Sequence, residues 1–200
     1  MIRICNLDKT REKEWDAFVE GRPEGTLFHQ TVWKNLIARV FGFKPMYIYA
    51  ERDGAIVGVL PLFQVPLFPT GRAFVSVPFG VYGGICSIDS DVSIGLLEKG
   101  RVLLEGGKGN YLELRQVRKI ADDLPVKDLY VTFRREIFPS DEENMAVIPR
   151  KRRAMIREGA KNGLSVSVGG EEEVDRFYAI YSHSVQILGT PVFPKRFLLL

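Results

Sequence analysis

Two apolar segments joined by a short polar turn constrain the fold of this chain more than any other feature. Residues 46–51 and 55–63 have the composition of strands, and the Arg52-Asp53-Gly54 turn between them is a strong signal for a β-hairpin. Pro61 and Pro66 indicate that the second strand ends there or lies at a sheet edge, because proline has no N–H to donate. Further strands are expected at residues 2–7, 72–77, 111–115 and 129–133.

Three helices are expected among these strands. Apolar residues at helical spacing predict one helix over residues 11–20 and another over residues 91–106. A third ends at Gly42, which occupies the position of a C-cap glycine. The apolar stripe of that helix consists of Trp33, Leu36, Ile37, Val40 and Phe41. The fold class is therefore predicted as α/β, with a mixed sheet of the α+β kind flanked by helices.

The composition is that of an ordinary globular protein. The chain has 200 residues, of which 46% are hydrophobic and 26% charged, with a net charge of +3. No apolar run approaches the ~20 residues that span a bilayer, and no signal peptide is recognisable, so we expect a cytoplasmic protein without a transmembrane segment. Two cysteines and two histidines form neither a disulfide framework nor a zinc pattern, and no metal site is expected.

A strongly basic segment lies at residues 149–168. Pro149 suits the first turn of a helix and Gly163 its end, and the alternation that follows predicts a strand over residues 164–168. The segment is either a site for phosphate groups or a solvated surface that the acidic residues 141–143 and 171–173 neutralise. Its cations are Arg150, Lys151, Arg152, Arg153, Arg157 and Lys161, against the single acid Glu158.

The C-terminal part begins to repeat the order of elements seen at the N-terminus. A long helix with three glutamates in its first turn follows the predicted strand, and Phe193 and residues 197–200 look like the start of another apolar helix. We therefore predict a domain at residues 1–140, a basic helical connector at 141–163 and an incomplete second domain at 164–200. The apolar end either docks on the first domain or belongs to a chain that is cut short.

Six short motifs stand out along the chain: Phe28–Trp33, Val57–Leu62, Val77–Gly84, Tyr111–Arg115, Lys151–Gly163 and Leu188–Phe193. In their order and spacing they resemble FemAB-like proteins. The resemblance is nearest to the branch associated with PEP-CTERM/exosortase exopolysaccharide systems, and it covers nearly the whole chain. One departure is the lack of the Gln/Arg-x-x-Gly-x-Gly/Ala loop that holds coenzyme A in ordinary GNAT enzymes, and another is that most of a second domain is absent.

The resemblance implies tandem GNAT-like domains that transfer an acyl or aminoacyl group to an amine. It places the reaction in cell-envelope, peptidoglycan or exopolysaccharide assembly. It also implies no tightly bound cofactor, an acyl donor (aminoacyl-tRNA or acyl-CoA) as co-substrate, and a phosphate-bearing small-molecule or lipid-linked acceptor. The expected partners are that acceptor, tRNA, and a second copy of the chain paired through the C-terminal part.

Few residues are candidates for the chemistry itself. Tyr82, in a glycine-rich loop that either faces a ligand or is a plain turn, could donate to an oxyanion. His29 is the other catalytic candidate, against a structural role. The alternative to an enzyme is a non-catalytic GNAT-like binding module that recognises a phosphate-bearing ligand. The residues predicted to bind substrate are Lys34, Arg115, Arg152, Arg153, Arg157 and Lys161.

Overall fold

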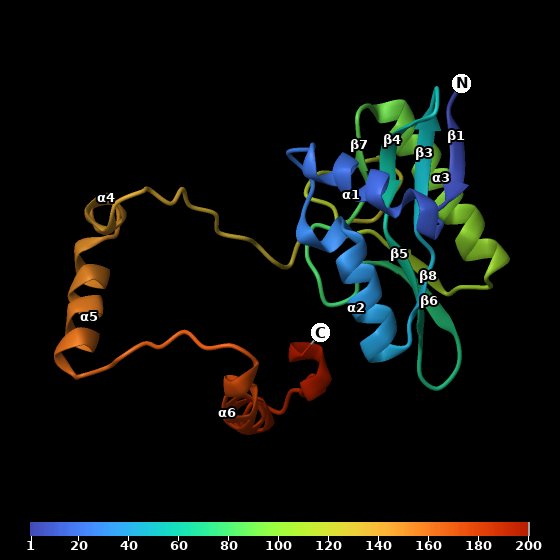
Figure 1. The fold of residues 1–200 in the computed structure, drawn as a ribbon. Helices are drawn as coiled ribbons and strands as arrows, with labels where there is room; N and C mark the ends of the chain where they lie inside the picture. The colour runs from blue at the N-terminus through green and yellow to red at the C-terminus, as the bar shows by residue number, and fades with distance from the viewer. Residues whose placement is uncertain (200) are drawn as a thin grey trace. The chain divides into compact units, whose positions relative to one another are not determined.

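The computed structural model describes residues 1–199, apart from the side chain of Ala160. The chain forms two compact units, of which unit 1 contains Met1–Val126 with Phe193–Leu198, and unit 2 contains Lys127–Val192. Each unit is described by itself below (Figure 1). The domain boundaries predicted at residues 140 and 163 stay predictions.

The first sheet of unit 1 is built around the predicted hairpin. Strands β3 (Ile48–Arg52) and β4 (Ala55–Leu60) pair antiparallel. Asp53 and Gly54 between them have φ angles of 52° and 85°, as a two-residue hairpin turn with two left-handed residues requires. Strand β1 (Arg3–Asn6) pairs with β3, and β7 (Cys86–Ser87) pairs with β4. The hairpin prediction is confirmed.

Pro61 divides the predicted strand 55–63 between two sheets. The chain leaves β4 at Leu60 and continues as β5 (Leu62–Pro66) in a second sheet of order β2-β5-β6-β8. Pro61 has no N–H for a ladder hydrogen bond, which suits the break. The second sheet also contains β2 (Lys44–Pro45), β6 (Arg72–Ser76) and β8 (Tyr111–Glu113), and β6 and β8 run parallel.

Helices cover both faces of the first sheet (Figure 1). Helices α1 (Glu12–Glu20) and α2 (Thr31–Phe41) contribute to one core cluster, and α3 (Ser90–Gly106) contributes to the other. All three predicted helices are confirmed, and Gly42 caps α2 with a φ of 70°. Tyr47, Tyr49 and Val59 belong to the cluster of α1 and α2, whereas Ile48, Ala50 and Leu60 belong to that of α3. Successive residues of a strand point to opposite faces, so one hairpin anchors both clusters.

Unit 2 consists of helices and irregular chain. Its helices are α4 (Asp141–Ala146), α5 (Arg150–Lys161) and α6 (Val174–Ile187), with a 3-10 turn at Glu171–Glu173. The predicted basic helix is confirmed, and Gly163 follows it with a φ of 70°. Over residues 1–199, no helix is both long and apolar enough to cross a membrane.

Two predicted strands are wrong. Residues 129–133 and 164–168 are not in a strand, and their apolar side chains are exposed, with Phe133 at 93% and Val168 at 99%. Alternating apolar residues favour a strand only where another strand supplies hydrogen bonds, and neither segment pairs with one in the described chain. The predicted apolar helix near the C-terminus is instead a 3-10 turn, Lys195–Leu198, within unit 1.

The packing of α3 against β4 leads to a matched pair of substitutions. A Cβ atom at Gly58 in β4 would lie 2.4 Å from Val92 Cγ1 and 3.1 Å from Leu96 Cδ1. We expect Gly58→Ala to lower the free energy of unfolding by about 1–3 kcal/mol, the usual cost of overpacking a core. Urea denaturation measures the change.

Gly106→Ala is the control for this substitution, because a Cβ atom there meets no atom within 4 Å. It should leave stability unchanged or raise it by up to about 1 kcal/mol, the helix propensity of alanine over glycine. Equal unfolding free energies for the two variants would contradict the close contact between α3 and β4.

Candidate functional site

The segment 77–85, here called the bridging loop, connects the two sheets of unit 1. It leaves the second sheet after Ser76 in β6 and enters the first sheet at Cys86 in β7. Val77, Phe79 and Tyr82 have positive φ angles of 55°, 62° and 55°. Such backbone costs about 1–3 kcal/mol for each non-glycine residue, and it persists only where the surroundings impose it. Strain of this kind concentrates at functional sites, which makes the loop the leading candidate site.

Arg115 holds the first half of the bridging loop. Its Nη1 donates to the carbonyl oxygens of Gly80 at 2.6 Å and Val77 at 3.3 Å. Its Nε donates to Glu113 at 2.9 Å, and its backbone N–H donates to the Ser76 hydroxyl oxygen at 2.8 Å. Arg115 therefore joins the ends of the parallel strands β6 and β8 to the loop that follows β6. In the structure Arg115 positions the bridging loop, and its predicted contact with substrate stays a prediction.

His29 and Thr26 hold the second half of the loop. The His29 Nε2 lies 3.2 Å from the Gly84 carbonyl oxygen. The Thr26 hydroxyl is shared between the Tyr82 carbonyl oxygen at 3.3 Å and the His29 Nδ1 at 2.9 Å. The His29 Nδ1 accepts from the Thr26 backbone N–H at 3.2 Å, so the ring proton belongs on Nε2. Burial lowers the pKa of His29 to about 4, although its bond to Gly84 opposes this shift. A neutral imidazole that forms a hydrogen bond at each ring nitrogen is suited to holding the loop.

Five carbonyl groups of the bridging loop accept hydrogen bonds from side chains, and some of its amide groups are open. With Gln116 donating to Ile85 at 3.4 Å, the carbonyl oxygens of residues 77, 80, 82, 84 and 85 all accept from side chains outside the loop. Within residues 1–199, the backbone N–H groups of Phe79 and Val81 donate to no protein acceptor. These two residues are 44% and 53% exposed, so their amides are candidates to bind an anionic or carbonyl oxygen of a ligand. Tyr82 is half-buried, and its carbonyl oxygen is one of the five that accept from side chains.

Lys34 links two helices. Its ammonium pairs with Glu12 of α1 and lies 5.9 Å from the ring centre of Tyr47, and its side chain is only 14% exposed. The structure therefore places Lys34 between α1 and α2 and not among the groups that hold the bridging loop. Its predicted contact with substrate stays a prediction.

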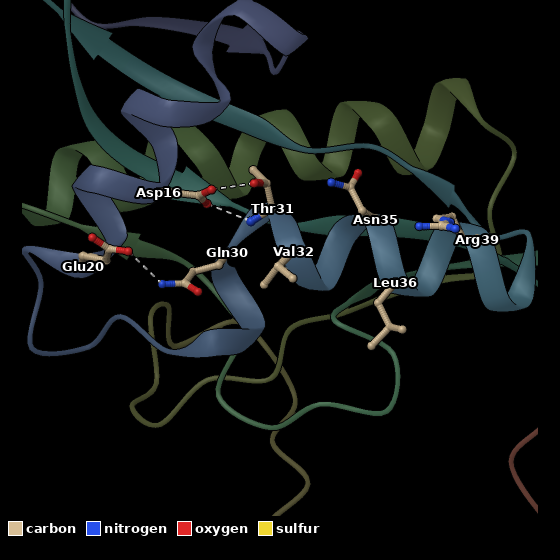
Figure 2. A pocket seen from close by; sticks show the side chains of 8 residues that line it. All are labelled: Asp16, Glu20, Gln30, Thr31, Val32, Asn35, Leu36 and Arg39. Atoms are coloured by element: carbon tan, nitrogen blue, oxygen red, sulfur yellow. Dashed lines mark hydrogen bonds between the residues drawn. The ribbon is translucent and has the colours of Figure 1, made fainter. Parts of the chain in front are cut away.

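A pocket of about 320 Å³ lies between α1 and α2 (Figure 2). Asp16 accepts from the Thr31 backbone N–H at 2.8 Å and from its hydroxyl at 2.5 Å, which caps α2, and Glu20 accepts from Gln30 at 3.4 Å. Figure 2 shows Arg39 toward the other end of the same face of α2. The sequence analysis missed this pocket because the packing of two helices creates it. The spacing of Asp16 and Glu20, four residues apart on one helix, was the available signal.

In unit 2, the predicted phosphate-binding residues lie on α5. Arg153 donates to the carbonyl oxygens of Met145 and Ala146 at 3.4 Å and 3.2 Å, at the C-terminal end of α4. Lys161 lies 4.0 Å from Glu158. Within residues 1–199, no ion pair joins Arg152, Arg153 or Arg157 to a carboxylate. The acidic residues 141–143 and 171–173 therefore form no ion pairs with these three arginines. A phosphate-binding role of the arginines stays a prediction.

Solved structures identify the fold. The chain is similar to FemX with a TM-score of 0.61 and 16% sequence identity, over 98% of this chain and 52% of that chain. It thus spans about half the length of the FemX chain that it matches. The likeness to this half of FemX shows the fold, a mixed α/β arrangement of two sheets and helices, and the prediction of a mixed α/β fold is confirmed.

Two acetyltransferase structures match less well. A predicted acetyltransferase with acetyl-CoA from Clostridium acetobutylicum has a TM-score of 0.48 and 11% identity, over 67% of this chain and 96% of that one. A ribosomal-protein-alanine N-acetyltransferase from Brucella melitensis biovar Abortus 2308 has a TM-score of 0.45 and 13% identity, over 68% and 99%. No family model and no curated protein sequence matches the chain.

The buried His29 should make stability depend on pH. Its pKa is about 4 in the folded protein against 6.5 when unfolded, so the stabilisation is complete above pH 6.5 and is lost as pH falls toward 4. The difference corresponds to about 3 kcal/mol. We expect His29→Gln, which cannot be protonated, to be less stable than the wild type at pH 7 but to show a smaller loss of stability between pH 6.5 and 4. Urea unfolding at a series of pH values measures both slopes.

His183→Gln is the matched control, because His183 is exposed on α6. It should keep the slope of the wild-type protein. A wild-type slope in the His29 variant would show that His29 is not held neutral in the folded state.

Proposed function

We propose that this chain takes part in the transfer of an acyl or aminoacyl group to an amine, and that the bridging loop of unit 1 is the reaction site. The observation that carries the proposal is the strained loop, held by Arg115 and His29 and with the open amides of Phe79 and Val81, in a fold like that of FemX. The setting proposed is cell-envelope assembly, of peptidoglycan or of the exopolysaccharide of PEP-CTERM/exosortase systems. Because the chain spans half of FemX, the activity of the whole protein is part of this proposal.

The chemistry requires a neutral amine beside an activated carbonyl and donors for the oxyanion that forms on attack. The amide N–H groups of Phe79 and Val81 are the proposed oxyanion donors, because these residues are exposed and their amides have no acceptor within residues 1–199. Arg115 is the proposed positioning residue, since it fixes the carbonyl groups on either side of Phe79. Tyr82 is the proposed contact to the substrate. The donor is aminoacyl-tRNA or acyl-CoA.

Helix α5 is the proposed contact to phosphate groups of the acceptor or of tRNA. Arg152, Arg153 and Arg157 form no ion pair with a carboxylate of residues 1–199, so their guanidinium groups retain donors for phosphate. The same observation favours the second candidate function, a non-catalytic module that binds a phosphate-bearing ligand. Both candidate functions require binding of a phosphate-bearing ligand, but only the transferase converts a substrate to product.

A transfer assay tests the reaction site. The protein is incubated with radiolabelled acyl-CoA or aminoacyl-tRNA and an amine-bearing nucleotide-linked muropeptide, and labelled amide is counted. We expect Arg115→Gln to lower the rate by about ten- to a hundredfold, because it removes a charge-assisted donor that orients the oxyanion groups. Arg118→Gln, at an exposed arginine near Arg115 in sequence, should retain the wild-type rate.

Equal rates in the two variants would remove the bridging loop from the reaction. Binding of the muropeptide with no labelled amide from either donor would favour the module. If the protein neither binds the muropeptide nor forms labelled amide, both candidate functions are contradicted.

A binding titration tests the phosphate role of α5. We expect the double variant Arg153→Gln/Arg157→Gln to bind the nucleotide-linked muropeptide or tRNA about tenfold or more weakly, with a shallower dependence of affinity on salt. Fluorescence anisotropy at two salt concentrations measures both quantities. Arg176→Gln, on the exposed surface of α6, is the control. An unchanged affinity and salt slope in the double variant would remove the phosphate role.

A further inference from the structure

Unit 1 carries a cluster of aromatic rings beside the bridging loop, here called the aromatic surface. Phe41 lies at its centre, 4.5 Å from Phe79 and 5.7 Å from Phe43 between ring centres. Phe28 meets Trp33 edge to face at 4.8 Å, and a Cβ atom on Gly80 of the loop would lie 2.7 Å from Phe28. The aromatic surface therefore includes one loop residue, Phe79, and touches another. Its members are Phe28, Trp33, Phe41, Phe43 and Phe79.

Residues Phe193–Leu198, here called the C-terminal segment, pack on this surface. Phe193 lies 5.1 Å from Phe79 and 6.2 Å from Phe41. Phe197 lies 5.9 Å from Phe41 and 6.1 Å from Trp33. Arg196 donates to the Val40 carbonyl oxygen in the last turn of α2, where a cation also meets the negative end of the helix dipole. The segment thus binds through two rings four residues apart and one charged donor.

This mode of packing resembles that of a bound peptide. No strand of either sheet includes the C-terminal segment, and its only regular element is the 3-10 turn Lys195–Leu198. Phe193 and Phe197 stack on each other at 5.0 Å, so the anchors form one compact unit. Short segments that present apolar anchors at positions i and i+4 are a common form of groove ligand.

The contact with Phe79 connects the segment to the loop. Phe79 has a positive φ and lies between the Arg115-bonded carbonyls of Val77 and Gly80. Its ring contacts Phe41 and Phe43, which belong to the helix side, and Phe193, which belongs to the segment.

We propose that the aromatic surface is a docking site for the C-terminal segment of the same chain, and that occupancy of the site sets the conformation of the bridging loop. Docking removes freedom from the Phe79 ring and so from the backbone on either side of it. The loop is ordered when Phe193 is seated and exchanges among conformations when the segment is released. This coupling does not depend on the proposed reaction. Hydrogen exchange of the loop amides therefore measures it without an activity assay.

Hydrogen exchange measured by mass spectrometry on the full chain tests the coupling. We expect Phe193→Ala to speed exchange of the Gly80 amide, which donates to the Val77 carbonyl oxygen within the loop, by about two- to tenfold, which corresponds to the loss of one or two aromatic pairs. Exchange in β3 and β4 should stay as in the wild type, because Phe193 is not part of either core cluster. Phe177→Ala is the matched control, since Phe177 stacks on Tyr181 in α6 of unit 2.

A peptide added in trans tests whether the surface is a docking site. The peptide of residues 191–199, Pro-Val-Phe-Pro-Lys-Arg-Phe-Leu-Leu, should restore slow exchange of the Gly80 amide in the Phe193→Ala protein. The same peptide with both phenylalanines replaced by alanine should not. Wild-type exchange should be independent of protein concentration, because the segment is supplied by the same chain.

Three outcomes would overturn the proposal. The first is wild-type exchange of the bridging loop in Phe193→Ala. The second is equally faster exchange in β3 and β4, which would mean a general loss of structure. The third is concentration-dependent protection of the loop in the wild type, which would mean that a second copy supplies the segment. A negative result in the transfer assay would not change what these exchange measurements say about the docking site.

Discussion

The structure of unit 1 depends on burial of the β3–β4 hairpin from both sides. Tyr47 and Tyr49 belong to the cluster beneath α1 and α2, and Ile48 and Ala50, between and after them, belong to the cluster beneath α3. A slip of one residue would exchange these two sets, so the register is strongly specified. The hairpin also fixes where β6 ends and where β7 begins, because both strands belong to the sheets built on the β4–β5 chain. The ends of the bridging loop are thereby set in space.

The bridging loop is held by side chains that come from distant parts of the sequence. Thr26 and His29 precede α2, whereas Arg115 and Gln116 follow β8, and together they engage five of its carbonyl groups. These contacts offset the cost of positive φ angles at non-glycine residues. A loop of this kind is ordered by its surroundings and not by its own sequence. Its conformation depends on residues that lead into α2 and on residues that follow β8.

The cations of the chain divide into those engaged in the fold and those that retain donors. Lys34 connects α1 to α2 through Glu12, and Arg115 joins the two parallel strands to the loop, so both contribute to the architecture of unit 1. The arginines of α5 in unit 2 have no carboxylate partner within residues 1–199. Charge alone does not distinguish these two groups in the sequence. Their neighbours in the structure distinguish them, because Lys34 pairs with a carboxylate of another helix whereas Arg153 contacts backbone carbonyl groups.

Local sequence determined the hairpin, the helices and their caps, because Asp53-Gly54, Gly42 and Gly163 impose backbone geometry through their own conformational preferences. It did not determine the state of residues 129–133 and 164–168, whose alternating pattern becomes a strand only beside a partner that supplies hydrogen bonds. Tertiary structure alone decided that Pro61 divides a strand between two sheets and that His29 and Arg115 meet one loop. Contacts between residues far apart in sequence depend on packing, and local patterns do not encode them.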